Sequence, residues 1–288
     1  MGFLTDWITD WLKELLISGI LSNLFGLFEK VNNQVGEIAG TVGMTPGAFS
    51  PGVFVLIQTL SETVVLPVAG LLLTFVMTWE LIQLIIDHNN LHQLDTWIFY
   101  KWIFKTMVAV LILSNTFNIV VGIFEVSQSI VNSAAGIVSG STAVSSDMMA
   151  ALEAELRLMD VGPLLGFWLQ SLLIGVVAVA VNIIVFIIVF GRMIEIYLLT
   201  SLAPLPLATL TSREMSGMGN NYLKSLLAVG FQGLLIMVCV AIYAVLVQGI
   251  TISGDPIGSI WMAIGYTILL CFTLFKTGNI CKNIFAAH

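Results

Sequence analysis

The sequence predicts an all-α integral membrane protein with about five transmembrane helices and an N-terminal amphipathic interfacial helix. Apolar residues make up 58% of its 288 residues and charged residues only 9%, with a mean hydropathy of +1.02. A water-soluble core cannot bury so large an apolar fraction, whereas helices in lipid expose it to hydrocarbon. Long apolar runs separated by short polar segments then set the number of helices.

Charge and cysteine content narrow the class of protein further. The formal net charge is −7 and the chain has no basic run, which argues against tight nucleic-acid binding through phosphate neutralisation, although nucleic acid can still pass through such a protein. The three cysteines, Cys239, Cys271 and Cys281, have no paired spacing, so we expect reduced, buried thiols. No cleavable signal peptide is expected, because Asp6 and Asp10 precede the first lysine.

Residues 1–30 are predicted to form the interfacial helix, because apolar residues from Phe3 to Leu16 recur at helical spacing with charged residues between them. The uncharged run that follows, Leu15 to Phe28, is shorter than the ~20 residues that a membrane crossing needs. We therefore expect this helix to lie on the membrane, with a sixth crossing as the alternative. Residues 31–52 are predicted to be a Gly-rich connector.

Residues 53–288 form the predicted polytopic helical membrane domain. Its expected spans lie at about 64–86, 97–122, 164–190, 225–247 and 257–275. An extracytoplasmic loop, 130–162, is expected to hold a short amphipathic helix in which Glu153 and Arg157 pair at i,i+4. A cytoplasmic-side Pro/Gly loop is expected at 201–221.

Polar residues recur every three or four positions after the middle of the second span, which places them on one helix face. These residues are Asn115, Asn118, Glu125, Ser129 and Asn132. Such a polar stripe should not face lipid: we favour a role in packing helices together, and lining a polar path is the alternative.

Charged residues inside the spans are expected to be paired. Glu80 lies near the cytoplasmic end of the first span, where we favour a partner in Lys101 or Lys105 over a role in lining a polar path. Arg192 and Glu195 are three residues apart and can pair with each other.

The stretch from Thr200 to Gln232 interrupts two long apolar runs. Pro204 and Pro206 lack N–H groups, so a helix that arrives from Leu164 should end near Ser201. Five small or polar residues then predict a turn before a new helix begins at Tyr222: Ser216, Gly217, Gly219, Asn220 and Asn221. Because four leucines between residues 202 and 210 are too apolar for free solvent, we favour a folded loop against the membrane over a plain cytoplasmic loop.

The distribution of Lys and Arg predicts the orientation. Seven basic residues fall on one side of the five-span arrangement: Lys101, Lys105, Arg192, Arg213, Lys224, Lys276 and Lys282. Arg157 alone falls in the opposite loops. The basic side is cytoplasmic by the positive-inside rule, so the N-terminus is expected outside and the C-terminus in the cytoplasm.

Catalytic and metal-binding motifs are not expected to contribute. His88 and His92 are four apart, but no zincin-type glutamate follows His88 and the pair falls in an expected loop, so we predict a solvated loop and no metal site. We expect no enzyme, no catalytic residue and no cofactor.

The order of features around the proline break also carries a family resemblance. Five features follow one another in this region. They are a helix, the break Ala203-Pro204-x-Pro206, the run Thr211-Ser212-Arg213, a Gly/Asn stretch and the run Tyr222-Leu223-Lys224. This order resembles the signature region of TrbL-type membrane subunits of type IV secretion and conjugation systems, most closely the short forms of Gram-positive conjugative elements. The chain departs from that pattern at Ala203, where glycine is expected, and at Tyr222, where tryptophan is expected.

The resemblance implies a function and partners. It implies a channel or scaffold subunit of a conjugation machine in the bacterial cytoplasmic membrane, a ring-like homo-oligomer such as a pentamer, and single-stranded DNA with its relaxase as cargo. Other secretion subunits, including cytoplasmic ATPases, would dock on the loop that carries Pro204, Pro206, Arg213, Tyr222 and Lys224, and lipid would surround the spans. The alternatives are a stand-alone secondary transporter, for which no inverted repeat is found, and a passive membrane scaffold.

Overall fold

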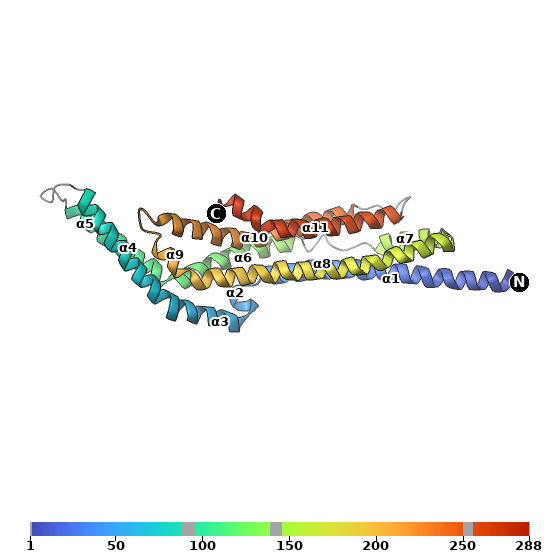
Figure 1. Cartoon of the computed structure of the whole chain (residues 1–288). Coiled ribbons are helices and arrows are strands. Elements are labelled where there is room, and N and C mark those ends of the chain that lie inside the picture. Colours follow the sequence, from blue (N-terminus) through green and yellow to red (C-terminus); the bar gives the residue numbers. More distant parts are fainter. Residues whose placement is uncertain (1, 88–95, 139–145, 250–255, 288) are drawn as a thin grey trace. The chain divides into compact units, whose positions relative to one another are not determined.

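The computed structural model describes residues 2–87, 96–138, 146–249 and 256–287, and in these ranges every regular element is a helix (Figure 1). The all-α prediction is confirmed. The elements are α1 (Gly2–Val42), α2 (Pro46–Phe49), α3 (Pro51–Leu60), the π-helical turn η1 (Ser61–Val65), α4 (Leu66–Asp87), α5 (Thr96–Ser114), α6 (Thr116–Val138), α7 (Ser146–Leu158), α8 (Val161–Leu202), α9 (Pro204–Ala208), α10 (Ser216–Gln248) and α11 (Pro256–Ile284).

The N-terminal helix is longer than its sequence predicts. α1 continues past residue 30 to Val42, so the first half of the predicted connector is helical. The remainder folds into α2, whose first turn is capped by the Thr45 hydroxyl accepting from the Ala48 N–H (3.2 Å), and into the start of α3. Proline begins both of these helices, a position where its missing N–H costs no helical hydrogen bond.

Six helical segments of the described chain are long and apolar enough to cross a membrane, one more than predicted. They are Pro51–Ile86, Thr96–Ser114, Thr116–Gly136, Val161–Leu202, Ser216–Val247 and Ile264–Ile284. The extra segment arises because the predicted second span divides at Asn115. Helical hydrogen bonds continue across this residue, from Asn115 N to Leu111 O (3.3 Å) and from Ile119 N to Asn115 O (3.0 Å), so the chain continues through an interrupted helix without a hairpin turn.

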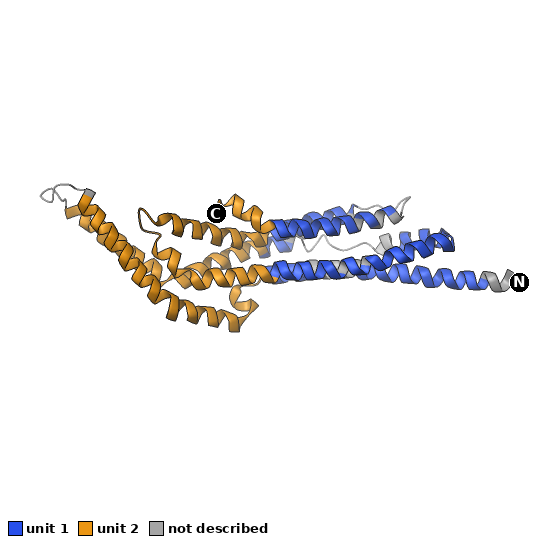
Figure 2. Cartoon of the chain, viewed as in Figure 1, with its two compact units in different colours: residues 1–42, 132–189, 235–276 blue, residues 43–131, 190–234, 277–288 orange. Residues whose placement is uncertain are grey.

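The chain divides into two compact units, whose boundaries fall within α6, α8, α10 and α11 (Figure 2). Unit 1 comprises residues 1–42, 132–189 and 235–276. In it α7 packs against α1, and the predicted Glu153–Arg157 pair forms on α7 with a 2.8 Å contact. Burial of Leu152 and Leu156 confirms the amphipathic character of this helix.

Unit 2 comprises residues 43–131, 190–234 and 277–288, and its two hydrophobic cores meet at α9. One core joins α4 to α5 and includes Ala208. The other joins α6, α8 and α10 and includes Leu207. The five-residue helix α9 therefore contributes neighbouring residues to both cores, which makes the proline break a packing centre of this unit.

Candidate functional site

The chain changes direction between α8 and α10 through the short helix α9. As predicted from the two prolines, α8 ends at Leu202, close to Ser201. The predicted turn over residues 216–221 is wrong: α10 begins at Ser216, six residues before Tyr222. Gly219 serves close packing, because a Cβ atom at this position would lie 2.8 Å from Leu210 Cα and 2.8 Å from Pro206 O.

The segment around α9 is folded into the protein. Ala203, Leu207, Ala208 and Thr209 are each less than 5% exposed. The Thr209 hydroxyl donates to the Pro206 carbonyl (2.8 Å), which satisfies the buried side chain locally. Protein, and not only lipid, therefore covers part of this apolar segment.

The residues predicted to dock partners have different environments. Pro204 is buried, and the Tyr222 hydroxyl donates to Leu199 O (2.8 Å), which ties the start of α10 to the end of α8. Arg213 and Lys224 are exposed. Of the five predicted residues, these two cations have the accessible charge that recognition of an acidic partner needs.

Glu214 is a residue of this site that the sequence analysis did not single out. It accepts hydrogen bonds from Trp79 Nε1 (3.1 Å) and from Gln83 Nε2, both on α4. These bonds favour the ionised carboxylate and hold the pKa of Glu214 below its ordinary value of 4.5. They also join the loop after α9 to α4, over a separation of more than 130 residues that no local pattern reveals.

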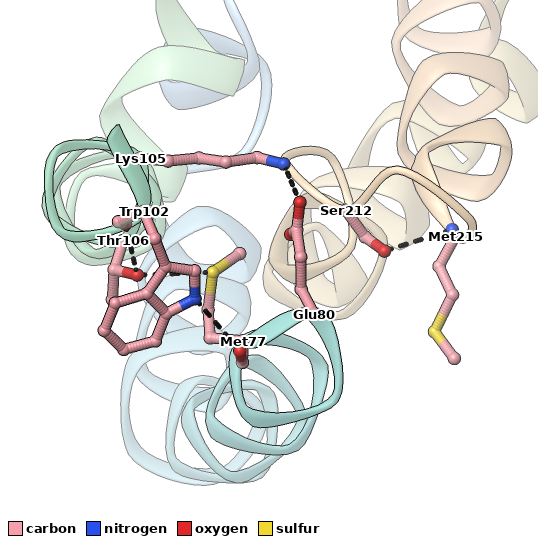
Figure 3. Close-up of polar contacts among 7 residues, drawn as sticks. All are labelled: Met77, Glu80, Trp102, Lys105, Thr106, Ser212 and Met215. Carbon is pink, nitrogen blue, oxygen red and sulfur yellow. Dashed lines mark hydrogen bonds and ion pairs between the residues drawn. The ribbon is translucent and has the colours of Figure 1, made fainter. Parts of the chain in front are cut away.

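Glu80 of α4 forms a buried ion pair with Lys105 of α5, one of its two predicted partners (Figure 3). The Glu80 side chain is 6% exposed and that of Lys105 is 32% exposed. Beside the pair, Trp102 Nε1 donates to Met77 O (3.1 Å) and so adds a second polar link between the two helices. The other predicted partner, Lys101, lies over the Trp97 ring, 5.9 Å from its centroid.

Arg192 and Glu195, which were predicted to pair with each other, both contact other helices. Arg192 is 3% exposed and donates from Nε to Val229 O and from Nη2 to Gly230 O, both at 3.1 Å. Glu195 accepts from Lys282 Nζ of α11 (3.0 Å). Thus these charges link α8 to α10 and α11, a geometry that spacing along one helix does not specify.

The predicted polar stripe lies on the surface of α6 and the residue preceding it. All five of its residues, Asn115, Asn118, Glu125, Ser129 and Asn132, are exposed. The opposite face is buried, where Val120 and Phe124 enter a core with α8 and α10. The stripe thus lies opposite the face that enters this core, and its predicted role in packing helices together stays a prediction, with the lining of a polar path as the alternative.

The histidine pair lies outside the described residues. Within the described ranges no cluster of three or more His, Cys, Asp or Glu side chains is arranged to hold a metal ion.

The comparison with protein families assigns the chain. The family model for TrbL/VirB6 plasmid conjugal transfer like protein matches residues 31–204, well over half of the sequence. The chain belongs to this family. It is a multi-pass membrane component of a conjugal transfer system. No curated protein and no solved structure matches it.

In this TrbL/VirB6-family chain, the region that matches the family model barely overlaps the segment that contains the proline break. The matched region ends at Pro204, the first residue of α9. The loop with Arg213 and Glu214 and all of α10 lie beyond it. The order of features that resembled the TrbL signature region, residues 200–232, thus points to the same family from a largely different part of the sequence.

Proposed function

We propose that this chain is a channel or scaffold subunit of a type IV secretion machine, and that several copies form a ring that helps to move a DNA–protein cargo across the bacterial cytoplasmic membrane. The supporting observation is the exposed polar stripe on an otherwise apolar span. Family membership supplies the conjugal transfer setting.

The charged member of the stripe needs cover from lipid. Glu125 is exposed within Thr116–Gly136, a segment suited to crossing a membrane. A charged side chain that faced lipid near the centre of a crossing would cost about 2.5–3.5 kcal/mol on translocon-insertion scales. A second copy of the chain or an aqueous path would remove this cost, and a ring of subunits around a conduit provides both.

The loop after α9 suits a cytoplasmic partner. Arg213 and Lys224 are exposed, and the bonds to Glu214 hold the loop against α4. A loop that is already held in place loses little conformational freedom when an acidic surface binds to it. We infer that acidic surfaces of cytoplasmic subunits, such as the ATPases of the machine, bind here.

Single cysteines on α6 test the proposal. In a chain with Cys239, Cys271 and Cys281 replaced by Ala, cysteine at Asn118 or Ser129 should react with a membrane-impermeant thiol reagent or form cross-links between copies. Cysteine at Leu71 of α4, which is 74% exposed and apolar, is the control and should do neither because it would face lipid.

Transfer and particle size complete the test. Deleting the gene should abolish intercellular DNA transfer, and the protein in native lipid should purify as a multi-copy particle. A monomeric particle that moves a small solute in liposomes, with stripe cysteines as unreactive as Leu71→Cys, would refute the proposal and favour a stand-alone transporter.

A further inference from the structure

A polar cavity of about 260 Å³ lies in unit 2 where three helical paths are irregular. One path contains the π-helical turn η1, the second is interrupted at Asn115 between α5 and α6, and the third restarts at Pro204 of α9. The polar side chains that line the cavity are those of Ser61, Glu62, Ser114, Asn115, Thr116 and Asn118.

Three irregular helical segments that border one cavity are an arrangement suited to ligand binding. π-helical turns occur often at functional sites, and interrupted helices in membrane proteins bind ions where their backbone borders a cavity. Two of the three irregular points lie in or beside segments that are suited to crossing a membrane: Glu62 in Pro51–Ile86 and Asn115 between Thr96–Ser114 and Thr116–Gly136. A polar cavity in such surroundings favours an occupant that needs shelter from lipid.

The side chains around the interruption offer acceptors more than donors. The Ser114 hydroxyl donates to Val110 O (2.7 Å), and the Thr116 hydroxyl donates to Ile112 O (3.0 Å). Each hydroxyl has a single hydrogen, so only its lone pairs remain for another partner. The side-chain amide of Asn115 donates to Leu111 O (2.9 Å), and its own carbonyl oxygen is still an acceptor.

One carboxylate sets the charge of the cavity. Glu62 is oriented by Gln58, whose Nε2 donates to Glu62 Oε1 (3.0 Å), and this bond uses one of its two oxygens. No Lys or Arg is among the described residues that line the cavity. Oxygen acceptors with a single negative charge match a hard cation of charge +1, whereas an anion would meet repulsion and a divalent ion would lack charge balance.

We propose that this cavity binds one partly hydrated alkali-metal cation, Na⁺ or K⁺, and that the cation joins the interrupted helix at Asn115 to η1. The volume of the cavity accommodates the ion and several water molecules, because one water molecule needs only about 10–15 Å³ of the cavity volume. Glu62 supplies the charge, and the hydroxyl and amide oxygens of residues 114–116 supply further ligands. This proposal does not depend on a role in DNA transfer.

Equilibrium binding to the purified full-length protein tests the site. Radioactive Na⁺ and the K⁺ analogue Rb⁺ are measured separately, with choline chloride keeping the ionic strength constant. We expect saturable binding of one of these ions at about one per chain and at least a tenfold loss of affinity in Glu62→Gln. Ser114→Ala, which removes a neutral ligand, should weaken binding less.

Two controls separate the site from general effects. Glu153→Gln removes an exposed carboxylate of unit 1 and should leave ion binding unchanged. Thermal unfolding should show stabilisation by the bound ion that exceeds stabilisation by choline, and Glu62→Gln should abolish the difference. Size-exclusion chromatography checks that each variant remains folded.

Three results would overturn the proposal: no saturable binding of Na⁺ or Rb⁺, equal stabilisation by all monovalent salts including choline, or unchanged affinity in a folded Glu62→Gln protein. If the affinity is unchanged in folded Glu62→Gln protein and the cavity also cross-links to a lysine of another copy, the occupant of the cavity is the ammonium group of that lysine. None of these results bears on DNA transfer, so failure here is distinct from failure of the proposed function.

Discussion

Gly219, in the first turn of α10, packs directly against the backbone of Leu210. A Cβ atom at position 219 would lie 2.8 Å from Leu210 Cα, and this backbone belongs to the segment that follows α9. The contact explains the glycine at position 219 of α10, although the sequence around it is typical of a turn. It also identifies the point at which the proline break is held against the next helix.

We predict that Gly219→Ala destabilises the protein by about 1–3 kcal/mol, because the new methyl group has to displace backbone atoms and not a mobile side chain. Gly217→Ala is the matched control: it lies in the same turn, with nothing within 4 Å of its Cβ position. Thermal unfolding in detergent measures both variants. Equal stability of the two would show that the close packing of α10 on this segment is wrong.

The second prediction concerns the Glu80–Lys105 pair. Lys105→Met should cost about 3–5 kcal/mol, because it leaves an uncompensated carboxylate that is only 6% exposed. Glu80→Gln should cost less, since the Lys105 side chain is 32% exposed and can turn to solvent. Replacing both residues should recover part of the loss, and a double-mutant cycle on the unfolding free energy measures the coupling. Additive effects would contradict the pair.

The third prediction concerns pH. The pKa of Glu214 lies below its ordinary value of 4.5, since Gln83 and Trp79 bond its ionised form. The folded pKa is lowered, so this stabilisation is fully present above pH 4.5 and is lost as the pH falls through the folded pKa. The indole N–H signal of Trp79 in NMR spectra should therefore shift with a midpoint below pH 4.5. Glu214→Gln should abolish that shift, and an identical titration in the variant would exclude Glu214 as its source.

The fourth prediction concerns the proline break and partner binding. Replacing Pro204 and Pro206 with Ala restores two N–H groups, so α8 should extend and DNA transfer should fail while the protein still accumulates in the membrane. Arg213→Glu should reduce binding of cytoplasmic subunits and leave membrane insertion intact, because Arg192 and Lys224 remain on that side. Mating assays and copurification measure these effects. Normal transfer by the double-alanine variant would show that the break has no role in docking.

The fifth prediction is topological. Because helical hydrogen bonds continue across Asn115, we treat α5 and α6 as one crossing and expect five in all, with the N-terminus outside. In a cysteine-free background, Leu158→Cys should react with an impermeant reagent from outside and Asn283→Cys only from the cytoplasm. Both positions are exposed. Reaction of both from one side would instead mean an even number of crossings between Leu158 and Asn283. Tyr100→Cys, which is also exposed, should react only from the cytoplasm, and its reaction from the same side as Leu158→Cys would show that α5 and α6 are two crossings.

The sequence by itself determined the class of protein, the end of α8 and the two candidate partners of Glu80, of which the structure selects Lys105. Composition demands lipid, and Pro204 and Pro206 cannot donate helical hydrogen bonds, so these conclusions depend on local chemistry that no fold can change. The partner of Glu80 was predictable because α4 and α5 are neighbours in sequence. The amphipathic helix α7 was predictable for a similar reason, since its pattern has the helical period.

Only the tertiary structure decided which polar groups meet across distant segments. Glu214 joins Trp79 and Gln83, and Arg192 meets the carbonyls of Val229 and Gly230, through contacts that depend on how helices pack. The start of α10 was predicted wrongly because glycine is common both in turns and where two helical segments pack closely. Only the position of the neighbouring backbone distinguishes these two roles. The exposure of the α6 stripe was decided in the same way: periodicity places residues on one face, but the packing of the other helices determines which face is buried.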